Sequence, residues 1–283
     1  FWLKLKASAD KPRAHHERMG AQLGLLCPAS LGGEFGYCCL CSVPAVGEKS
    51  SHDVRTVLQI LDVIYGGCAL EEDHRVVDSE VASRQMVQAG LASKAAVYGE
   101  LPPMGTLQLL HQVGARPGQV YYDLGSGTGK TVVLAGMLGL QATGVELVKE
   151  RIDVAQSALN RLRDQDVIDL MLTAGLDAQL TGKDEGSPGI HFVHGNVLDV
   201  DFSDADIVFM YSLCFSPEML ESLGKVAERM RVGAVIISNQ GLPGEALGER
   251  KRFICGDWQR RVQDFTIQTV VGTADSDESS SSS

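Results

Sequence analysis

The stretch Tyr121-Tyr-Asp-Leu-Gly-Ser-Gly-Thr-Gly-Lys130 decides the fold of this 283-residue chain, together with Gly144-Val-Glu146 further along. An apolar run before Asp123 predicts a short buried strand, and the glycine-dense turn after it leads into a second apolar run of helical length. The predicted elements are a strand over 120–122, a helix over 131–138 and a second strand over 142–145. Each of the two strands therefore delivers a carboxylate at its end.

The glycines and the two carboxylates give this unit its chemistry. Gly125, Gly127 and Gly129 let the backbone approach a ligand closely, and the N–H groups that open the following helix favour an anionic group. Glu146 can accept hydrogen bonds from both hydroxyls of a ribose. A turn that only packs a helix on a strand would not need both Asp123 and Glu146. The sequence therefore predicts a site for a nucleoside cofactor.

Three classes of cofactor compete for such a site. A P-loop requires G-x-x-x-x-G-K-[ST], but Leu124 stands at the position of its first glycine, where it would block the phosphate cradle. A dinucleotide fingerprint requires G-x-G-x-x-G, and its third glycine is replaced by Lys130. The pattern present, D-x-G-x-G-x-G with an acidic residue after the next strand, resembles motif I and its partner in class I S-adenosylmethionine (SAM) methyltransferases. That resemblance implies SAM as the cofactor, with Asp123 and the glycine turn around its methionine part.

Helices and strands alternate through most of the remaining chain. Further helices are predicted over 54–65, 106–113, 149–164 and 217–230, and a weaker helical stretch over about 72–96 with a break near Gly90. Further strands are predicted over 190–193, 205–210 and 234–238. A polar insertion covers about 173–189, and two β-like stretches within 258–271 predict a closing hairpin. We expect an α/β fold with a Rossmann-like class I methyltransferase sheet, mostly parallel with a C-terminal antiparallel hairpin, plus a small helical N-terminal lead-in. The expected domains are 1–50, irregular or disordered; 51–97, the helical lead-in; 98–273, the methyltransferase domain; and 274–283, a disordered acidic and serine-rich tail.

The composition is that of a soluble globular protein, with no apolar run of the roughly 18 residues that a membrane helix needs. Seven cysteines, an odd number without a regular framework, favour reduced thiols inside a cell. No metal site is expected from the cluster Cys27, Cys38, Cys39 and Cys41, because the adjacent Cys38 and Cys39 cannot easily both point at one metal. No signal peptide is recognisable, and because the first residue is Phe1, it stays open whether the chain is a fragment.

Two basic segments stand out in a chain whose net charge is −11. Residues 1–18 and residues 249–261 each carry five Lys or Arg residues against two acidic residues, which gives each a net charge of +3. Weak contacts of these segments with DNA phosphates are one interpretation, and a solvated surface is the simpler one. The acidic chain as a whole suits a basic protein substrate such as a histone.

The segment Tyr98-Gly99-Glu100-Leu101 ends about 22 residues before Asp123. With Asp123-Leu-Gly-Ser-Gly127 and Gly144-Val-Glu146, it resembles the non-SET histone-lysine methyltransferases of the disruptor-of-telomeric-silencing family, over roughly residues 95–241. In that family a Tyr-Gly-Glu loop crosses the cofactor. The family methylates a lysine on the exposed globular face of histone H3 in the nucleosome. The resemblance therefore implies SAM-dependent lysine methylation in the nucleus.

The resemblance also implies the site residues. Those at the cofactor would be Tyr98, Gly99, Glu100, Leu101, Asp123, Gly125, Ser126, Gly127, Gly129, Lys130, Glu146, Asn196 and Val197. Asn196 and Val197 stand where the family usually has Asp-Phe; Asn196 would hydrogen-bond the adenine amino group, and a plain loop residue is the alternative. The catalytic residues would be Tyr211, Ser212 and Phe215, in a stretch where the family has Asn-Asn-Phe-x-Phe.

Methyl transfer from SAM needs mainly positioning, because the sulfonium methyl is already activated. Tyr98, Tyr211 and Phe215 would form apolar walls that exclude water and favour a neutral lysine amine, and Ser212 would orient the amine. Two alternatives stay open. The altered stretch Tyr211–Cys214 keeps open a class I methyltransferase for another protein or a small molecule. The other alternative is a non-catalytic binding module with the same fold, against which the intact Asp123, glycines and Glu146 argue.

Overall fold

The computed structural model describes residues 54–67, 79–97, 99–173, 176, 189–256 and 262–272. The chain divides into two compact units, and all the described residues belong to the second, Val43–Ser283. The predictions for residues 1–50 and 274–283, including the cysteine cluster and the basic segment 1–18, fall outside the described residues.

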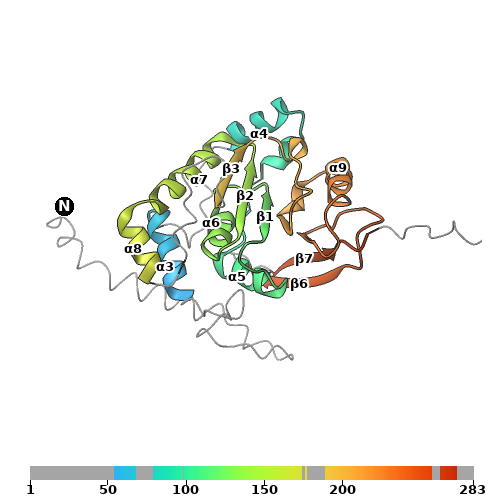
Figure 1. Ribbon diagram of the computed structural model, residues 1–283. Coiled ribbons are helices and arrows are strands. Elements are labelled where there is room, and N and C mark those ends of the chain that lie inside the picture. The colour runs from blue at the N-terminus through green and yellow to red at the C-terminus, as the bar shows by residue number, and fades with distance from the viewer. Residues whose placement is uncertain are drawn as a thin grey trace, which may run out of the picture. The chain divides into compact units, whose positions relative to one another are not determined.

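One mixed sheet forms the centre of the described structure, with the strand order β3-β2-β1-β4-β5-β7-β6 (Figure 1). Its strands are β1 Val120–Leu124, β2 Gln141–Glu146, β3 Ile190–His194, β4 Ile207–Met210, β5 Val235–Ser238, β6 Lys251–Gly256 and β7 Val262–Thr269. The first five strands run parallel, whereas β7 runs antiparallel to both β5 and β6. The predicted fold class, mostly parallel with a C-terminal antiparallel hairpin, is confirmed.

Helices cover both faces of this sheet. They are α3 Val54–Ile64, α4 Ser79–Gln88, α5 Pro103–Gln112, α6 Lys130–Met137, α7 Lys149–Leu162, α8 Gln165–Thr173 and α9 Pro217–Ala227, with short 3₁₀ turns η1 Ser93–Ala96, η3 Val197–Asp199 and η4 Ser212–Cys214. Helices α6 and α7 pack directly on β2 and β3, and α3 packs on α6, α7 and α8. Helix α9 lies on the other side (Figure 1), where Met219 and Leu223 join Val208 and Met210 of β4 in one apolar cluster.

The structure differs from the predictions in two elements, the first strand of the hairpin and helix α8. The prediction that places both strands of the hairpin within 258–271 is wrong for the first strand, which is β6. Because β6 lies at the edge of the sheet, it carries charged, exposed side chains such as Lys251 and Arg252 instead of a buried apolar run. Helix α8 was not predicted. The helical stretch expected over about 72–96, with a break near Gly90, is observed as α4 and η1, and Gly90 between them has a φ of +77°.

The strand order reverses its direction between β1 and β4, at the carboxyl ends of these two strands. From β1 the chain moves outward to β2 and β3, and it returns to β4 on the other side of β1. The loops after β1 and β4 therefore lead away from each other, and ligands of open α/β sheets bind at such a point. Within the described residues, every helix is too short or too polar to cross a membrane.

Candidate cofactor site

The glycine turn between β1 and α6 requires glycine for its shape. Gly125, Gly127 and Gly129 all have positive φ angles, of +92°, +56° and +80°. A Cβ atom on Gly129 would also lie 2.5 Å from the ring of Phe192 and 3.0 Å from the Cβ atom of Ala155. Gly129 is the N-cap residue of α6, and it has no side chain that could accept a hydrogen bond from the helix. The first N–H groups of α6 therefore point into the turn without a capping side chain. These N–H groups are available to an anionic group.

Asp123, at the end of β1, is the most strongly perturbed acid of the site. The side chain is buried; its Oδ2 accepts a hydrogen bond from the hydroxyl of Thr131, and its Oδ1 has no hydrogen-bond partner. Burial raises the pKa of this carboxyl to about 7. The hydrogen bond from Thr131 lowers the pKa, and the negative charge of Glu146 raises it further. A buried carboxyl oxygen without a donor is a place for a cationic or N–H group of a ligand.

Glu146, at the end of β2, closes the other side of the turn. Its Oε2 accepts a hydrogen bond from the N–H of Gly127 at 2.9 Å, and its Oε1 accepts one from the N–H of Val148 at 2.8 Å. A carboxylate offers about four lone-pair positions. The two backbone bonds leave two positions, which matches the two hydroxyls of a ribose.

The predicted loop around Gly99 and Glu100 does reach the glycine turn, whereas Tyr98 lies outside the described residues. Glu100 accepts hydrogen bonds from the hydroxyl of Thr128 at 2.8 Å and from the ammonium of Lys130 at 2.9 Å. Both charged side chains are nearly buried, with exposed fractions of 9% and 5%. A buried ion pair of this kind fixes the loop against the first turn of α6, because either charge alone would be costly to bury.

The loop also contacts the residues that follow β4. A Cβ atom on Gly99 would lie 3.1 Å from the ring of Tyr211, and one on Gly125 would lie 3.7 Å from the ring of Phe215. Tyr211 in turn packs edge-on against Phe265 of β7, with ring centroids 5.7 Å apart. The structure therefore brings Tyr211 to the loop at Gly99 and Phe215 to the glycine turn, while Leu101 is buried against Gly105.

Ser212 lies inside the fold. The side chain has no exposed surface, and its hydroxyl accepts hydrogen bonds from the N–H groups of Asn239 and Gln240, at 3.1 and 3.4 Å. These contacts tie the turn after β4 to the turn after β5. We therefore keep the prediction of contact with a substrate amine for Tyr211 and Phe215, and assign Ser212 to holding the turn in place.

The predicted adenine side of the site begins after β3. The side-chain oxygen of Asn196 accepts a hydrogen bond from the N–H of Leu198 at 3.0 Å and so caps the 3₁₀ turn η3. This capping bond leaves one lone pair of that oxygen for a donor such as an adenine amino group. Val197 is buried in the apolar cluster beneath the turn, and the hydroxyl of Ser126 is buried without a hydrogen-bond partner.

Two residues at this site were not predicted as site residues. The hydroxyl of Tyr65, at the end of α3, donates to the carbonyl of Thr128 in the glycine turn at 2.8 Å, and the Tyr65 ring lies below the Lys130 ammonium. Arg151 of α7 lies 3.6 Å from Glu146. Tyr65 counts in the sequence only as one more apolar position of a helix, and no local pattern distinguishes Arg151. No group of three or more metal-binding side chains occurs within the described part of the chain.

Comparison with known proteins identifies the family. A family model described as "Histone methylation protein DOT1" matches residues 80–247. The chain belongs to this family. The match begins after α3, so Tyr65 lies outside it.

Several relatives have modest identity to this chain. A histone-lysine N-methyltransferase, H3 lysine-79 specific, of Dictyostelium discoideum is 26% identical over 147 residues, which are 52% of this chain and 8% of that protein. The protein of the same description from Debaryomyces hansenii is 28% identical over 193 residues, 68% of this chain and 15% of that protein. The O-methyltransferase cnsE of Penicillium expansum is 28% identical over 138 residues, 46% of this chain and 42% of that protein. The chain thus spans less than half the length of each of these relatives.

Solved structures resemble the chain more distantly. Magnesium protoporphyrin IX methyltransferase of Synechocystis PCC 6803 has a TM-score of 0.43 at 10% identity, covering 75% of this chain and 90% of that one. TrmN from Thermus thermophilus has a TM-score of 0.45 at 18% identity, covering 63% of this chain and 52% of that one.

Proposed function

We propose that this chain is a SAM-dependent histone-lysine N-methyltransferase that acts on a lysine of histone H3 in the nucleosome core. Membership of the DOT1 family and the names of the relatives support this function. The observation that carries it is the joining of three segments at one point: the loop at Gly99 and Glu100, the glycine turn, and the aromatic residues after β4. A cofactor held by the turn would thereby face an aromatic wall on which a substrate side chain can lie.

The residues of the turn fit SAM in charge and shape. The unpartnered Oδ1 of Asp123 suits the ammonium of its methionine part, and the two lone-pair positions left on Glu146 suit its ribose. The uncapped N–H groups at the start of α6 suit its carboxylate. When bound, SAM supplies a methyl group on a positively charged sulfur, which needs no further activation.

The protein residues then position the amine and exclude water. An aliphatic lysine amine has an ordinary pKa of about 10.4, so it must lose its proton before it can attack. An apolar channel favours the neutral amine because burial disfavours the charged form. Tyr211 and Phe215 provide such walls beside the turn, and Tyr98 stays a predicted third wall. Holding the amine about 3 Å from the methyl, in line with the bond that breaks, provides most of the remaining acceleration.

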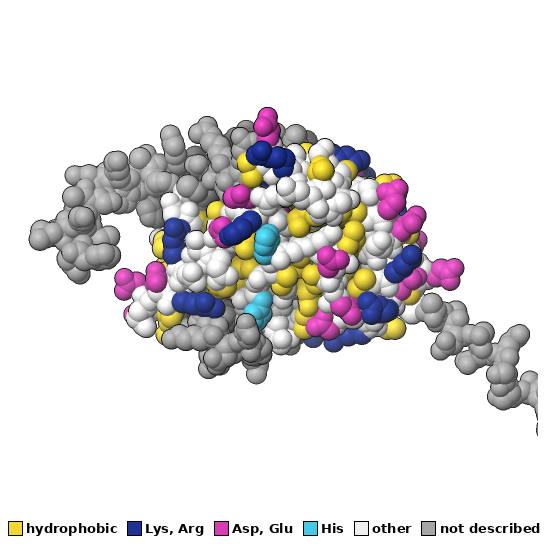
Figure 2. Space-filling model, turned by 90° about the horizontal axis from the view of Figure 1, so that it is seen from above, with side chains coloured by type: hydrophobic (Ala, Val, Ile, Leu, Met, Phe, Trp, Pro, Cys, Tyr) yellow, Lys and Arg dark blue, Asp and Glu magenta, His cyan; other side chains and the backbone are white. Residues whose placement is uncertain are grey.

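The charged surface favours a protein substrate over attraction to DNA alone. On the face shown in Figure 2, basic and acidic side chains alternate around apolar ones and form no field of one sign. The described part of the basic segment 249–261 is partly used within the fold, because Arg252 donates to Asp264 at 2.6 Å and Arg250 donates to the carbonyl of Gln240 at 3.4 Å. DNA phosphate contacts of the kind expected from the sequence are therefore proposed as weak and secondary.

Transfer of labelled methyl from SAM to intact nucleosomes tests this function, with free histones and free DNA as alternative substrates. We expect label on histone H3 in nucleosomes. Glu146→Gln should reduce the transfer at least ~100-fold, because its amide N–H₂ would oppose the backbone donors that now bind the carboxylate. Glu218→Gln, on the exposed first turn of α9, is the matched control and should retain wild-type activity. Bound SAM without label on any histone would contradict the histone substrate.

One observation favours a second candidate, a methyltransferase for another protein or for a small molecule. The stretch Tyr211-Ser-Leu-Cys-Phe215 departs from the family's Asn-Asn-Phe-x-Phe, and an O-methyltransferase is among the relatives. In the nucleosome assay this candidate predicts cofactor binding with no histone labelling. A protein that bound neither SAM nor its product would instead support the non-catalytic module.

A further inference from the structure

Arg151 stands in a position that its own helix does not favour. It lies in the first turn of α7, where the helix dipole disfavours a cation, and its exposed fraction is only 6%. Burying a guanidinium is costly unless its charge and N–H groups are compensated. The contacts that Arg151 makes must therefore account for its place.

Those contacts join two separate parts of the candidate site. One terminal nitrogen, Nη2, donates a hydrogen bond to the carbonyl of Ala96 at 2.7 Å. The other, Nη1, lies 3.6 Å from Oε1 of Glu146. Ala96 precedes Arg151 by 55 residues, so the guanidinium bridges segments that lie far apart in the sequence.

Ala96 leads directly into the substrate side of the site. It is the last residue of η1, and three residues later Gly99 packs on the ring of Tyr211. The turn η1 itself contacts η4, which contains Ser212. A shift of Ala96 would therefore move the loop at Gly99 and Glu100 relative to the aromatic wall.

We infer that Arg151 is a positioning residue, which rests on the proposed function of the site. It holds the carboxylate that is assigned to the ribose and the loop that is assigned to the cofactor and substrate in one fixed arrangement. Arginine suits this task because its planar fork directs separate N–H groups to two acceptors, whereas a lysine ammonium would reach one of them. Arg151 touches neither reacting atom, so its effect on the reaction passes through Glu146 and the loop.

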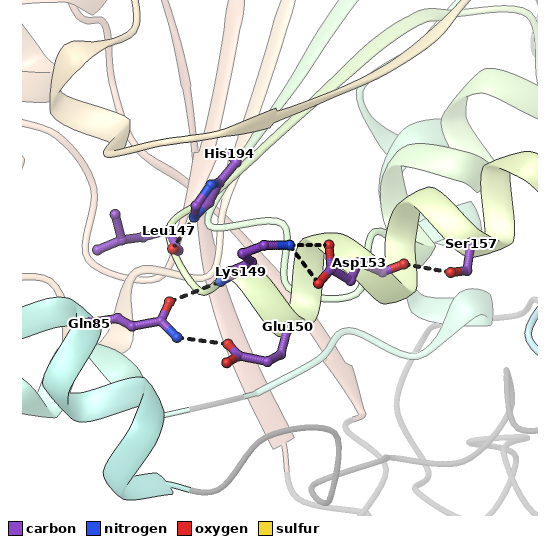
Figure 3. A network of polar contacts seen from close by, with 7 residues as sticks. All are labelled: Gln85, Leu147, Lys149, Glu150, Asp153, Ser157 and His194. Carbon is purple, nitrogen blue, oxygen red and sulfur yellow. Dashed lines mark hydrogen bonds and ion pairs between the residues drawn. The ribbon is translucent and has the colours of Figure 1, made fainter.

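A second tether joins α4 to α7 and allows this role to be separated from simple helix packing. Figure 3 shows Gln85 of α4 between Lys149 and Glu150: its Oε1 accepts from the N–H of Lys149 at 3.0 Å, and its Nε2 donates to Glu150 at 2.7 Å. This tether holds α4 at the surface and does not include Glu146. Gln85→Ala therefore loosens the same helix pair without removing the bridge to Ala96.

The same helix offers a closer control. Arg161 also donates to a backbone carbonyl at 2.7 Å, that of Ile64 in α3, which adjoins Tyr65 and neither Glu146 nor the loop at Gly99. Arg151→Met and Arg161→Met thus each remove one guanidinium bond from α7 to another element. Only the former removes a bond to the segment that leads into the loop at Gly99.

The test measures the whole chain in three ways. Amide hydrogen exchange follows residues 93–101 without cofactor, calorimetry gives the Kd for S-adenosylhomocysteine, and kinetics on nucleosomes give the KM for SAM and kcat. For Arg151→Met we expect faster exchange at 93–101 and a Kd and KM raised about tenfold or more, with a smaller change in kcat. Arg151→Lys, which keeps a charge near Glu146, should restore part of the affinity. Gln85→Ala should retain the wild-type Kd, and Arg161→Met, whose lost bond adjoins Tyr65, should leave exchange at 93–101 unchanged.

The outcomes separate this inference from the proposed function. Unchanged exchange and unchanged Kd in Arg151→Met would overturn the inference, as would equally fast exchange at 93–101 in Arg151→Met and Arg161→Met. If Arg151→Met fails to fold, Arg151→Lys decides by the same exchange and Kd measurements. If wild-type protein labels no histone, the proposed function fails, while hydrogen exchange in the unliganded chain still decides whether Arg151 holds the loop.

Discussion

Replacing Gly129 by alanine is expected to lower the free energy of unfolding by about 2–5 kcal/mol and to weaken SAM binding more than tenfold. The φ angle of +80° costs an alanine about 1–2 kcal/mol, and overpacking against Phe192 and Ala155 adds about 1–3 kcal/mol. Relief of the overlap would move the turn and misalign the N–H groups that start α6. Denaturant unfolding and calorimetric titration measure the two effects.

Gly118→Ala is the matched control for this prediction. Gly118 has nearly the same φ angle, +85°, but a Cβ atom there would meet no atom within 4 Å. We expect it to lose only the conformational part, about 1–2 kcal/mol, and to bind SAM normally. The cost of Gly129→Ala should shrink toward that of Gly118→Ala when it is measured in a Phe192→Ala background, as in a double-mutant cycle. Equal decreases in the free energy of unfolding for the two variants would show that the close approach to Phe192 does not contribute to the cost of Gly129→Ala.

Local patterns suffice for most of the fold because each parallel strand is a short apolar run bounded by glycine or a polar turn. The strands around Asp123 and Glu146 were predicted within two residues of their observed ends for this reason. The edge strand β6 could not be found in this way, since one of its faces is exposed and charged. Helix α8 follows α7 after a short break, and its apolar residues are interrupted by Asp166 and Asp169.

The residues of the candidate site likewise fall into those that the sequence identifies and those that only the structure reveals. Asp123, Glu146 and the glycines are local to the turn, so their spacing identifies them in the sequence. Tyr65 and Arg151 act through contacts with backbone carbonyls 63 and 55 residues away, and a side chain that binds a carbonyl leaves no pattern at its partner. The buried position of Ser212 likewise depends on the turn after β5, which only the assembled sheet brings to it.

The pH dependence of SAM binding should report the state of Asp123. The pKa of this carboxyl is about 7 in the unliganded fold, above its ordinary value of 3.8, because it is buried. The folded chain therefore holds this proton more tightly than the unfolded chain, and stability from this group is lost as the pH rises from about 4 to 7. The ammonium of SAM favours the ionised carboxylate. Affinity should thus rise up to tenfold per pH unit as the pH approaches 7, and level off above it.

Asp123→Asn separates this effect from damage to the fold. The asparagine has no charge to bury, so the unliganded variant should unfold at a higher temperature than the wild type at pH 8, while binding SAM roughly 30- to 1,000-fold more weakly. Its affinity should also change little between pH 5 and 7. Thr131→Val tests the direction of the pKa effect. It removes the hydrogen bond that lowers the pKa of Asp123, so the rise in SAM affinity should move to higher pH. A wild-type affinity that is flat from pH 5 to 7 would place the cofactor's ammonium away from Asp123. The raised pKa would then be a cost of burial alone, with no part in binding.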